Sequence, residues 1–206
     1  MNTTKNKLYF YPLWLRIWHG INALGIIILI ITGITMNSGL ENSPINFHLN
    51  IKLHNYTGAI VALNYLLYFI GNLVTDNKKF YIVKPKNFIK RPMKQAYYYA
   101  WGMFHGMKAP YPLSEKRKFN PLQKYSYIMV MYIAVPLVII TGIGLMFPEL
   151  IFNKIYNISG VLITAVIHSA MGFFISFFLI VHLYIASIGK SPLDNFKGII
   201  NGWHHV

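Results

Sequence analysis

Two histidines lie in one long apolar stretch of the chain, residues 160–188, and their spacing suggests a shared chemistry. His168 and His182 are fourteen residues apart. That is close to four helical turns, so both imidazoles face nearly the same way, about 21 Å apart along the axis. The stretch contains no Asp, Glu, Lys, Arg or Pro and is long enough to cross a bilayer. Ionisable side chains inside a membrane indicate a functional site. The alternative is two polar side chains satisfied by neighbouring helices.

Composition indicates an integral membrane protein. Of the 206 residues, 55% are hydrophobic and only 12% are charged. We expect one domain over residues 1–206, without a separate soluble part. The net charge of +14 does not predict nucleic-acid binding, because the basic residues flank apolar stretches, as in cytoplasmic loops that face anionic lipid. Cysteine is absent, which excludes disulfides, cysteine-bound iron–sulfur clusters and covalent c-type haem in this chain.

Four apolar stretches predict an all-α integral membrane protein built as a four-helix bundle. The predicted spans are residues 12–36, 52–74, 124–147 and 160–188. Pro136 predicts a kink in the third span. Similar sequences, TGITM at 32–36 and TGIGLM at 141–146, end the first and third spans. Between the second and third spans, residues 88–107 mix basic and aromatic side chains and predict a helix lying in the cytoplasmic interface.

Basic residues set the predicted orientation. The N-terminal segment, residues 76–124 and the tail contain seventeen Lys and Arg residues between them. The other two loops contain only Lys52 and Lys154. The excess of positive charge predicts that both termini are cytoplasmic. We therefore expect Lys118 inside and Glu149 outside.

This orientation places four histidines at two depths. His19 and His182 are predicted near the cytoplasmic ends of their helices, and His54 and His168 near the outer ends. Paired imidazoles from different helices are typical axial ligands of a b-type haem. Two histidines per iron leave no position for oxygen or substrate, so the predicted chemistry is one-electron transfer. Glycines beside these histidines would make room for a porphyrin, or simply for close helix packing: Gly20, Gly58 and Gly172.

Several motifs resemble a known family. RIWHG with the TGI that follows it, KLHNYTG, FNPLQKY and the two histidines of the fourth span resemble the cytochrome b subunits of membrane-bound formate dehydrogenases, nickel–iron hydrogenases and thiosulfate reductases. The resemblance implies two haems b in a bacterial inner-membrane protein. It also implies electron exchange with menaquinone or ubiquinone and with a partner subunit that carries iron–sulfur clusters or several haems. By resemblance, His19 and His182 ligate the inner haem, and His54 and His168 the outer haem.

The same resemblance points to a quinone site. In the formate dehydrogenase subunits an Asn-x-Gly-Gln motif lies at the quinone pocket near the inner haem. The matching residues here are Asn120 to Gln123, with Leu122 in place of the glycine. We expect Asn120 and Gln123 to contact quinone, although Asn before Pro is also a helix start signal. Gln123 is expected to take no part in that cap. Arg16, one turn before His19, could pair with a haem propionate or act as a positive-inside anchor.

Two other functions are compatible with the sequence. A stand-alone dihaem cytochrome b would pass electrons between quinone and a small oxidant or reductant such as superoxide, but the family of that type has a compact inner loop. A cofactor-free membrane anchor would show no haem absorption. No acidic residue is predicted mid-membrane, which disfavours an ion pump with a carboxylate relay. We therefore expect the electron-transfer subunit of a larger oxidoreductase rather than a complete enzyme.

Overall fold

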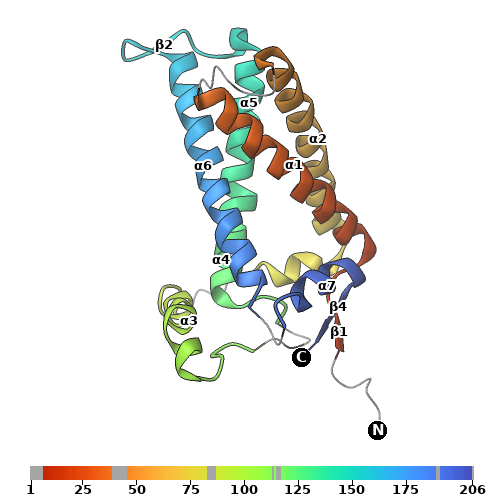
Figure 1. Cartoon of the computed structure of the whole chain (residues 1–206). Helices are drawn as coiled ribbons and strands as arrows, with labels where there is room; N and C mark the ends of the chain where they lie inside the picture. The colour runs from red at the N-terminus through yellow and green to blue at the C-terminus, as the bar shows by residue number, and fades with distance from the viewer. Residues whose placement is uncertain are drawn as a thin grey trace.

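Four long helical spans run alongside one another (Figure 1). The computed structural model describes residues 7–38, 46–82, 87–112, 114, 117–188 and 191–205. The spans are α1 (Leu13–Ser38), α2 (Phe47–Val74), α6 (Gly160–Ala186) and a third composed of α4 (Pro121–Met129), the π-helical segment η4 (Val130–Ala134) and α5 (Val135–Met146). The shorter elements are β1 (Lys7–Tyr9), η2 (Asp76–Phe80), α3 (Lys90–Ala100), η3 (Gly102–His105), η5 (Pro148–Leu150), β2 (Lys154–Ile155), β3 (Ile158–Ser159), α7 (Asp194–Asn201) and β4 (Trp203–His205).

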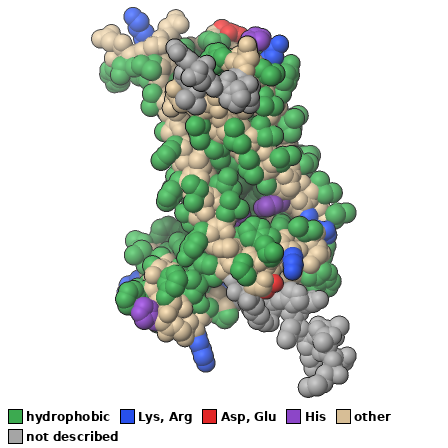
Figure 2. All heavy atoms as spheres, viewed as in Figure 1, with side chains coloured by type: hydrophobic (Ala, Val, Ile, Leu, Met, Phe, Trp, Pro, Cys, Tyr) green, Lys and Arg blue, Asp and Glu red, His purple; other side chains and the backbone are tan. Residues whose placement is uncertain are grey.

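Each of the four spans is long and apolar enough to cross a membrane. Figure 2 shows hydrophobic side chains over the length of the bundle, with most Lys and Arg side chains toward its ends. The predicted four-helix membrane protein is therefore confirmed.

The bundle consists of two helix pairs. α1 packs along α2, and α5 packs along α6, whereas contacts between the pairs are sparse. Two buried asparagines of α2 bind carbonyl groups of α1: Asn50 Nδ2 donates to Thr32 O at 3.1 Å, and Asn64 Nδ2 donates to Trp18 O at 3.0 Å. Such bonds hold membrane helices together, since lipid offers the amides no alternative partner.

A cluster of buried apolar residues joins the four spans. Its members are Leu15, Tyr68, Val130, Met131, Ala134, Val135 and Ile175. Ile175 is seven residues from His168 and seven from His182. The cluster thus lies between the two histidine levels on α6, and through Leu15 and Tyr68, which stacks on Trp18, it extends to the level of His19.

Local capping moves two span boundaries away from their predicted positions. α2 begins at Phe47, because the Asn46 side chain caps it by accepting from the His48 N–H, so Lys52 lies in the helix rather than in a loop. The third span begins at Pro121, directly after the capping residue Asn120. The predicted irregularity at Pro136 takes the form of the π-helical η4, which directly precedes the turn that contains the proline.

The predicted interfacial helix is confirmed as α3. Large apolar residues are exposed at every fourth position across it: Ile89, Met93, Tyr97 and Trp101. Side chains at this spacing share one face of a helix, and an exposed apolar face of this kind suits the membrane interface.

The tail contains structure that the sequence analysis did not predict. β1 and β4 pair antiparallel, with Lys7 opposite His205 and Tyr9 opposite Trp203. This pairing brings the two ends of the described chain to one end of the bundle, beside α7 (Figure 1). We call it the terminal end, and the opposite end, which carries the β2–β3 hairpin, the hairpin end.

The charge distribution predicts that the terminal end is cytoplasmic. Lys118 is only 3% exposed and would label poorly, so Lys108, which is exposed, is the better test position. A membrane-impermeant thiol reagent added to spheroplasts should label Tyr156→Cys at the hairpin end and leave Lys108→Cys unlabelled until the membrane is permeabilised. The native chain has no cysteine to interfere. The opposite labelling pattern would reverse the predicted topology.

Candidate functional site

His19 of α1 faces His182 of α6 near the terminal end. Their ring centroids are 6.4 Å apart. Aromatic rings surround the pair: Phe178 stacks on His182 at 5.6 Å, and Tyr127 lies 6.1 Å from the same imidazole. Trp18, next to His19, stacks on Tyr68 at 4.4 Å. The two imidazoles are half-buried among these rings.

His54 of α2 faces His168 of α6 near the hairpin end. Here the ring centroids are 6.2 Å apart. Both facing pairs join α6 to the α1–α2 pair, across the part of the bundle where few backbone contacts are made. The structure therefore brings together the four histidines in the two pairs that the sequence analysis predicted.

The separation within each pair leaves room for one metal atom. A ligating nitrogen lies about 2 Å from its metal and about 1 Å from its ring centre, so imidazoles on opposite sides of one iron have centroids about 6 Å apart. Among the described residues, no group of three or more His, Cys, Asp or Glu side chains could hold a metal ion. Two nitrogens suffice where a porphyrin supplies the other four ligands.

Two threonines hold the imidazoles at the hairpin end. Thr32 Oγ1 lies 2.7 Å from His54 Nδ1, and Thr141 Oγ1 lies 3.0 Å from His168 Nδ1. Each hydroxyl also donates to the carbonyl four residues earlier in its own helix. With its one proton used there, the hydroxyl must accept from Nδ1–H. Nε2 of each imidazole is then unprotonated and able to ligate a metal.

The glycines that follow these threonines leave space for the same rings. A Cβ at Gly142 would lie 3.2 Å from His168 Cε1, and one at Gly33 would lie 3.6 Å from His54 Cε1. The repeated Thr-Gly of TGITM and TGIGLM thus has one role at both places. Sequence reasoning noticed the repeat but not this role.

The three glycines predicted to make room for a porphyrin stand in open surroundings. A Cβ at Gly20 or Gly172 would meet no atom within 4 Å, and one at Gly58 would meet only Leu29, at 3.9 Å. Gly172 is one helical turn after His168. A macrocycle bound near these glycines would therefore meet little steric hindrance from the chain.

Arg16 remains a candidate for binding an anion near His19. Its Nε atom is buried and has no hydrogen-bond partner among the described residues. An unsatisfied guanidinium nitrogen is costly unless an acceptor reaches it. A haem propionate would be a suitable acceptor.

Asn120 and Gln123 form a capping box at the start of α4. Gln123 N–H donates to Asn120 Oδ1 at 2.9 Å, and Asn120 N–H donates to Gln123 Oε1 at 3.1 Å. The prediction that Gln123 lies outside the cap is therefore wrong: a Gln three residues after the N-cap can reach back to its N–H. Asn120 Nδ2 also donates to the Tyr99 hydroxyl at 2.9 Å, and burial raises the pKa of that phenol.

Comparisons with known proteins agree with this arrangement. The family described as "Prokaryotic cytochrome b561" matches residues 10–202. A curated relative, "Putative cytochrome YdhU" from Escherichia coli (strain K12), is 29% identical over 198 residues, which cover 96% of this chain and 75% of the relative. The match includes all four helical spans and both histidine pairs.

Proposed function

The chain belongs to the prokaryotic cytochrome b561 family, and we propose that it carries two haems b and transfers electrons across the membrane between a quinone pool and a partner redox subunit. The observation that carries this proposal is that the imidazole rings face each other in two pairs, with centroid separations of 6.4 and 6.2 Å. His19 and His182 would hold one haem, and His54 and His168 the other.

Bis-histidine haems supply one-electron redox centres when bound. With His19 and His182 holding one haem and His54 and His168 the other, no ligand position would remain for a small molecule, and the chain would exchange electrons only with neighbouring redox partners. The threonines keep the protons of His54 and His168 on Nδ1, which strengthens Nε2 as a donor. The two sites would be about 20 Å apart from the helical rise.

We place quinone exchange at the terminal end, beside the His19–His182 pair. Gln123 is one helical turn before Tyr127, whose ring lies 6.1 Å from His182. Within the capping box Gln123 uses its Oε1 atom, so its amide N–H groups are the part of the side chain that could donate to a quinone oxygen. Asn120, held by Tyr99, would fix the geometry of this turn.

A partner subunit with iron–sulfur clusters or several haems completes the proposal. A chain without an open metal position or a carboxylate relay has no evident chemistry of its own besides conducting electrons. The motifs shared with cytochrome b subunits of oxidoreductase complexes favour such a partner. We propose a bacterial inner membrane as the location, with both termini cytoplasmic.

Histidine substitutions test the pairing. His54→Ala and His168→Ala should each remove the same one of the two haems, and His19→Ala and His182→Ala the other, because each variant lacks one axial ligand. Haem-to-protein ratio and redox titration of the purified variants give the result. His48→Ala is the matched control, since His48 lies in the same helix as His54 but outside both pairs. Loss of one haem by both His19→Ala and His168→Ala would refute the assignment.

Removing a threonine hydroxyl should change the haem at the hairpin end without removing it. Thr141→Val leaves Nδ1–H of His168 without its acceptor, so the imidazole becomes a weaker donor and the ferric state loses stabilisation. The midpoint potential should rise by about 40 mV, which corresponds to a hydrogen bond of about 1 kcal/mol in a one-electron couple. Thr141→Ser keeps the hydroxyl and should keep the potential. Equal potentials in Thr141→Val and the wild type would show that the bond does not tune the ligand.

Gln123→Glu tests the quinone site, because it preserves the capping box and replaces the amide donor with a carboxylate that only accepts hydrogen bonds. Glutamate retains an oxygen for the Asn120 N–H. Quinol-dependent haem reduction should slow by about tenfold or more, while the thermal midpoint and both haem spectra stay near those of the wild type. Gln123→Leu, which also removes the cap contact, should in addition lower the thermal midpoint. A wild-type rate and normal inhibitor sensitivity in both variants would place quinone elsewhere.

A further inference from the structure

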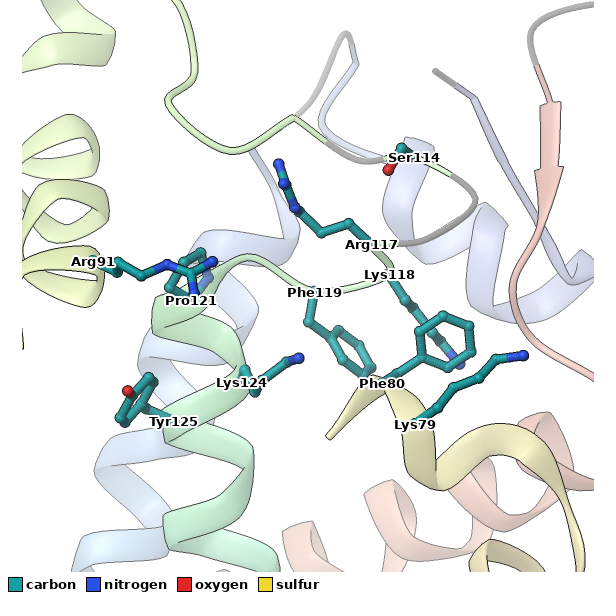
Figure 3. Close-up of a pocket in the computed structure, with 10 residues that line it drawn as sticks. All are labelled: Lys79, Phe80, Arg91, Ser114, Arg117, Lys118, Phe119, Pro121, Lys124 and Tyr125. Carbon is teal, nitrogen blue, oxygen red and sulfur yellow. The ribbon is translucent and has the colours of Figure 1, made fainter. Parts of the chain in front are cut away.

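A basic cavity of about 290 Å³ lies between η2, α3 and α4 (Figure 3). None of the four paired histidines is among its lining residues. Of the ten described residues that line it, five are basic and none is acidic. The basic residues are Lys79, Arg91, Arg117, Lys118 and Lys124. Lys79 pairs with Asp76 at 3.6 Å, and Lys124 Nζ donates to Ile82 O at 2.8 Å. The concentration of positive charge favours an anion in the cavity.

Lys118 is the most deeply buried of these cations. It is 3% exposed, and its Nζ donates to Asn77 Oδ1 at 3.3 Å. The ammonium group lies over aromatic rings on several sides, 4.7 Å from the Tyr11 ring centroid and 5.5 Å from that of Phe119. Burial lowers the pKa of Lys118 to about 7. An anion in the cavity would stabilise the charged form that burial disfavours.

Two arginines bring a further concentration of charge. The guanidinium groups of Arg91 and Arg117 both lie over the ring of Tyr111, at 5.6 and 5.8 Å. Two like charges near one ring repel each other, and an anion nearby would offset part of that repulsion. The planar fork of donors on each guanidinium suits the oxygens of a phosphate group.

The surroundings of the cavity distinguish a lipid from a soluble phosphate. On its α4 side the lining residue Tyr125 packs edge-on against Phe88 at 4.9 Å, and Phe88 is 55% exposed. Ile89 and Met93 are exposed too, but each is two residues from Arg91 and so lies on the opposite face of α3. Cations therefore lie in the cavity and the exposed ring of Phe88 lies beside it, which suits a ligand with an anionic head and acyl chains.

We propose that this cavity binds the phosphate headgroup of an acidic phospholipid from the leaflet at the terminal end. Arg91 and Arg117 would bind the phosphate, and the acyl chains would lie along the exposed ring of Phe88. Lys118, whose ammonium group lies beside Phe80 and apart from both guanidinium groups, would add to the positive potential of the cavity (Figure 3). Basic pockets beside membrane helices have the chemistry to bind such headgroups. The proposal stands independently of the haem and quinone assignments.

Lipid titration of the full-length haem-loaded protein tests it. Protein in detergent with phosphatidylcholine is titrated with phosphatidylglycerol, and bound lipid is counted by native mass spectrometry while the thermal midpoint is followed. Arg91→Ala and Arg117→Ala should each weaken phosphatidylglycerol binding about fivefold. Lys94→Ala is the matched control, because Lys94 is exposed on the same helix as Arg91 and does not line the cavity, and it should bind as the wild type does. Lys118→Met adds a third variant, but the arginine variants decide the result if it fails to fold.

Several results would overturn the proposal. Equal phosphatidylglycerol binding by the arginine variants and Lys94→Ala would show non-specific adsorption. Equal stabilisation by added phosphatidylcholine would remove the requirement for negative charge. Glycerol 3-phosphate that protects and competes as well as phosphatidylglycerol would identify a soluble phosphate as the ligand. Loss of haem in Arg91→Ala or Arg117→Ala would assign the cations to a haem carboxylate instead.

Discussion

The facing imidazoles are the interaction on which the rest of the structure depends. α1–α2 and α5–α6 each pack as a close pair, but few backbone contacts join one pair to the other. α6 supplies an imidazole at two levels, one toward His19 and one toward His54. Ile175, halfway between the two histidines of α6, belongs to the buried apolar cluster that joins the helices. A cytochrome needs this combination, because its helices must be held apart where a macrocycle lies and must pack together elsewhere.

Polar groups that the bilayer cannot satisfy are used to position these ligands. Thr32 satisfies its own hydroxyl proton within α1, accepts from His54, and offers its backbone carbonyl to Asn50 of α2. Thr141 repeats the first two of these contacts toward His168. The repeated Thr-Gly sequence therefore reflects a shared physical requirement: an imidazole that is to ligate through Nε2 needs an acceptor for Nδ1–H and a small residue beside its ring.

Features that depend on the residues of a single helix could be predicted from the sequence. Length and hydropathy predicted the four spans, and helical periodicity with alternating direction predicted which histidines face each other. Span boundaries were less accurate, because they depend on side chains such as Asn46 and Asn120 that bind the first turn of a helix. The β1–β4 pairing was not predicted, since it joins residues about two hundred positions apart in short segments without strong alternation. The threonine–histidine bonds were missed because they require the relative rotation of two helices.

The basic residues at the terminal end differ in burial, which a count of charges does not reveal. The positive-inside rule treats every Lys and Arg there as equivalent, and for exposed residues such as Lys94 and Lys108 that is adequate. Lys118 is different, because it is enclosed by Tyr11, Phe80 and Phe119 and pays a desolvation cost that an exposed anchor avoids. A solvent-exposed lysine would contribute equally to the orientation of the protein in the membrane. The position of Lys118 instead fits the anionic headgroup that we propose for the cavity it lines, because an anion there would favour the charged form of the lysine.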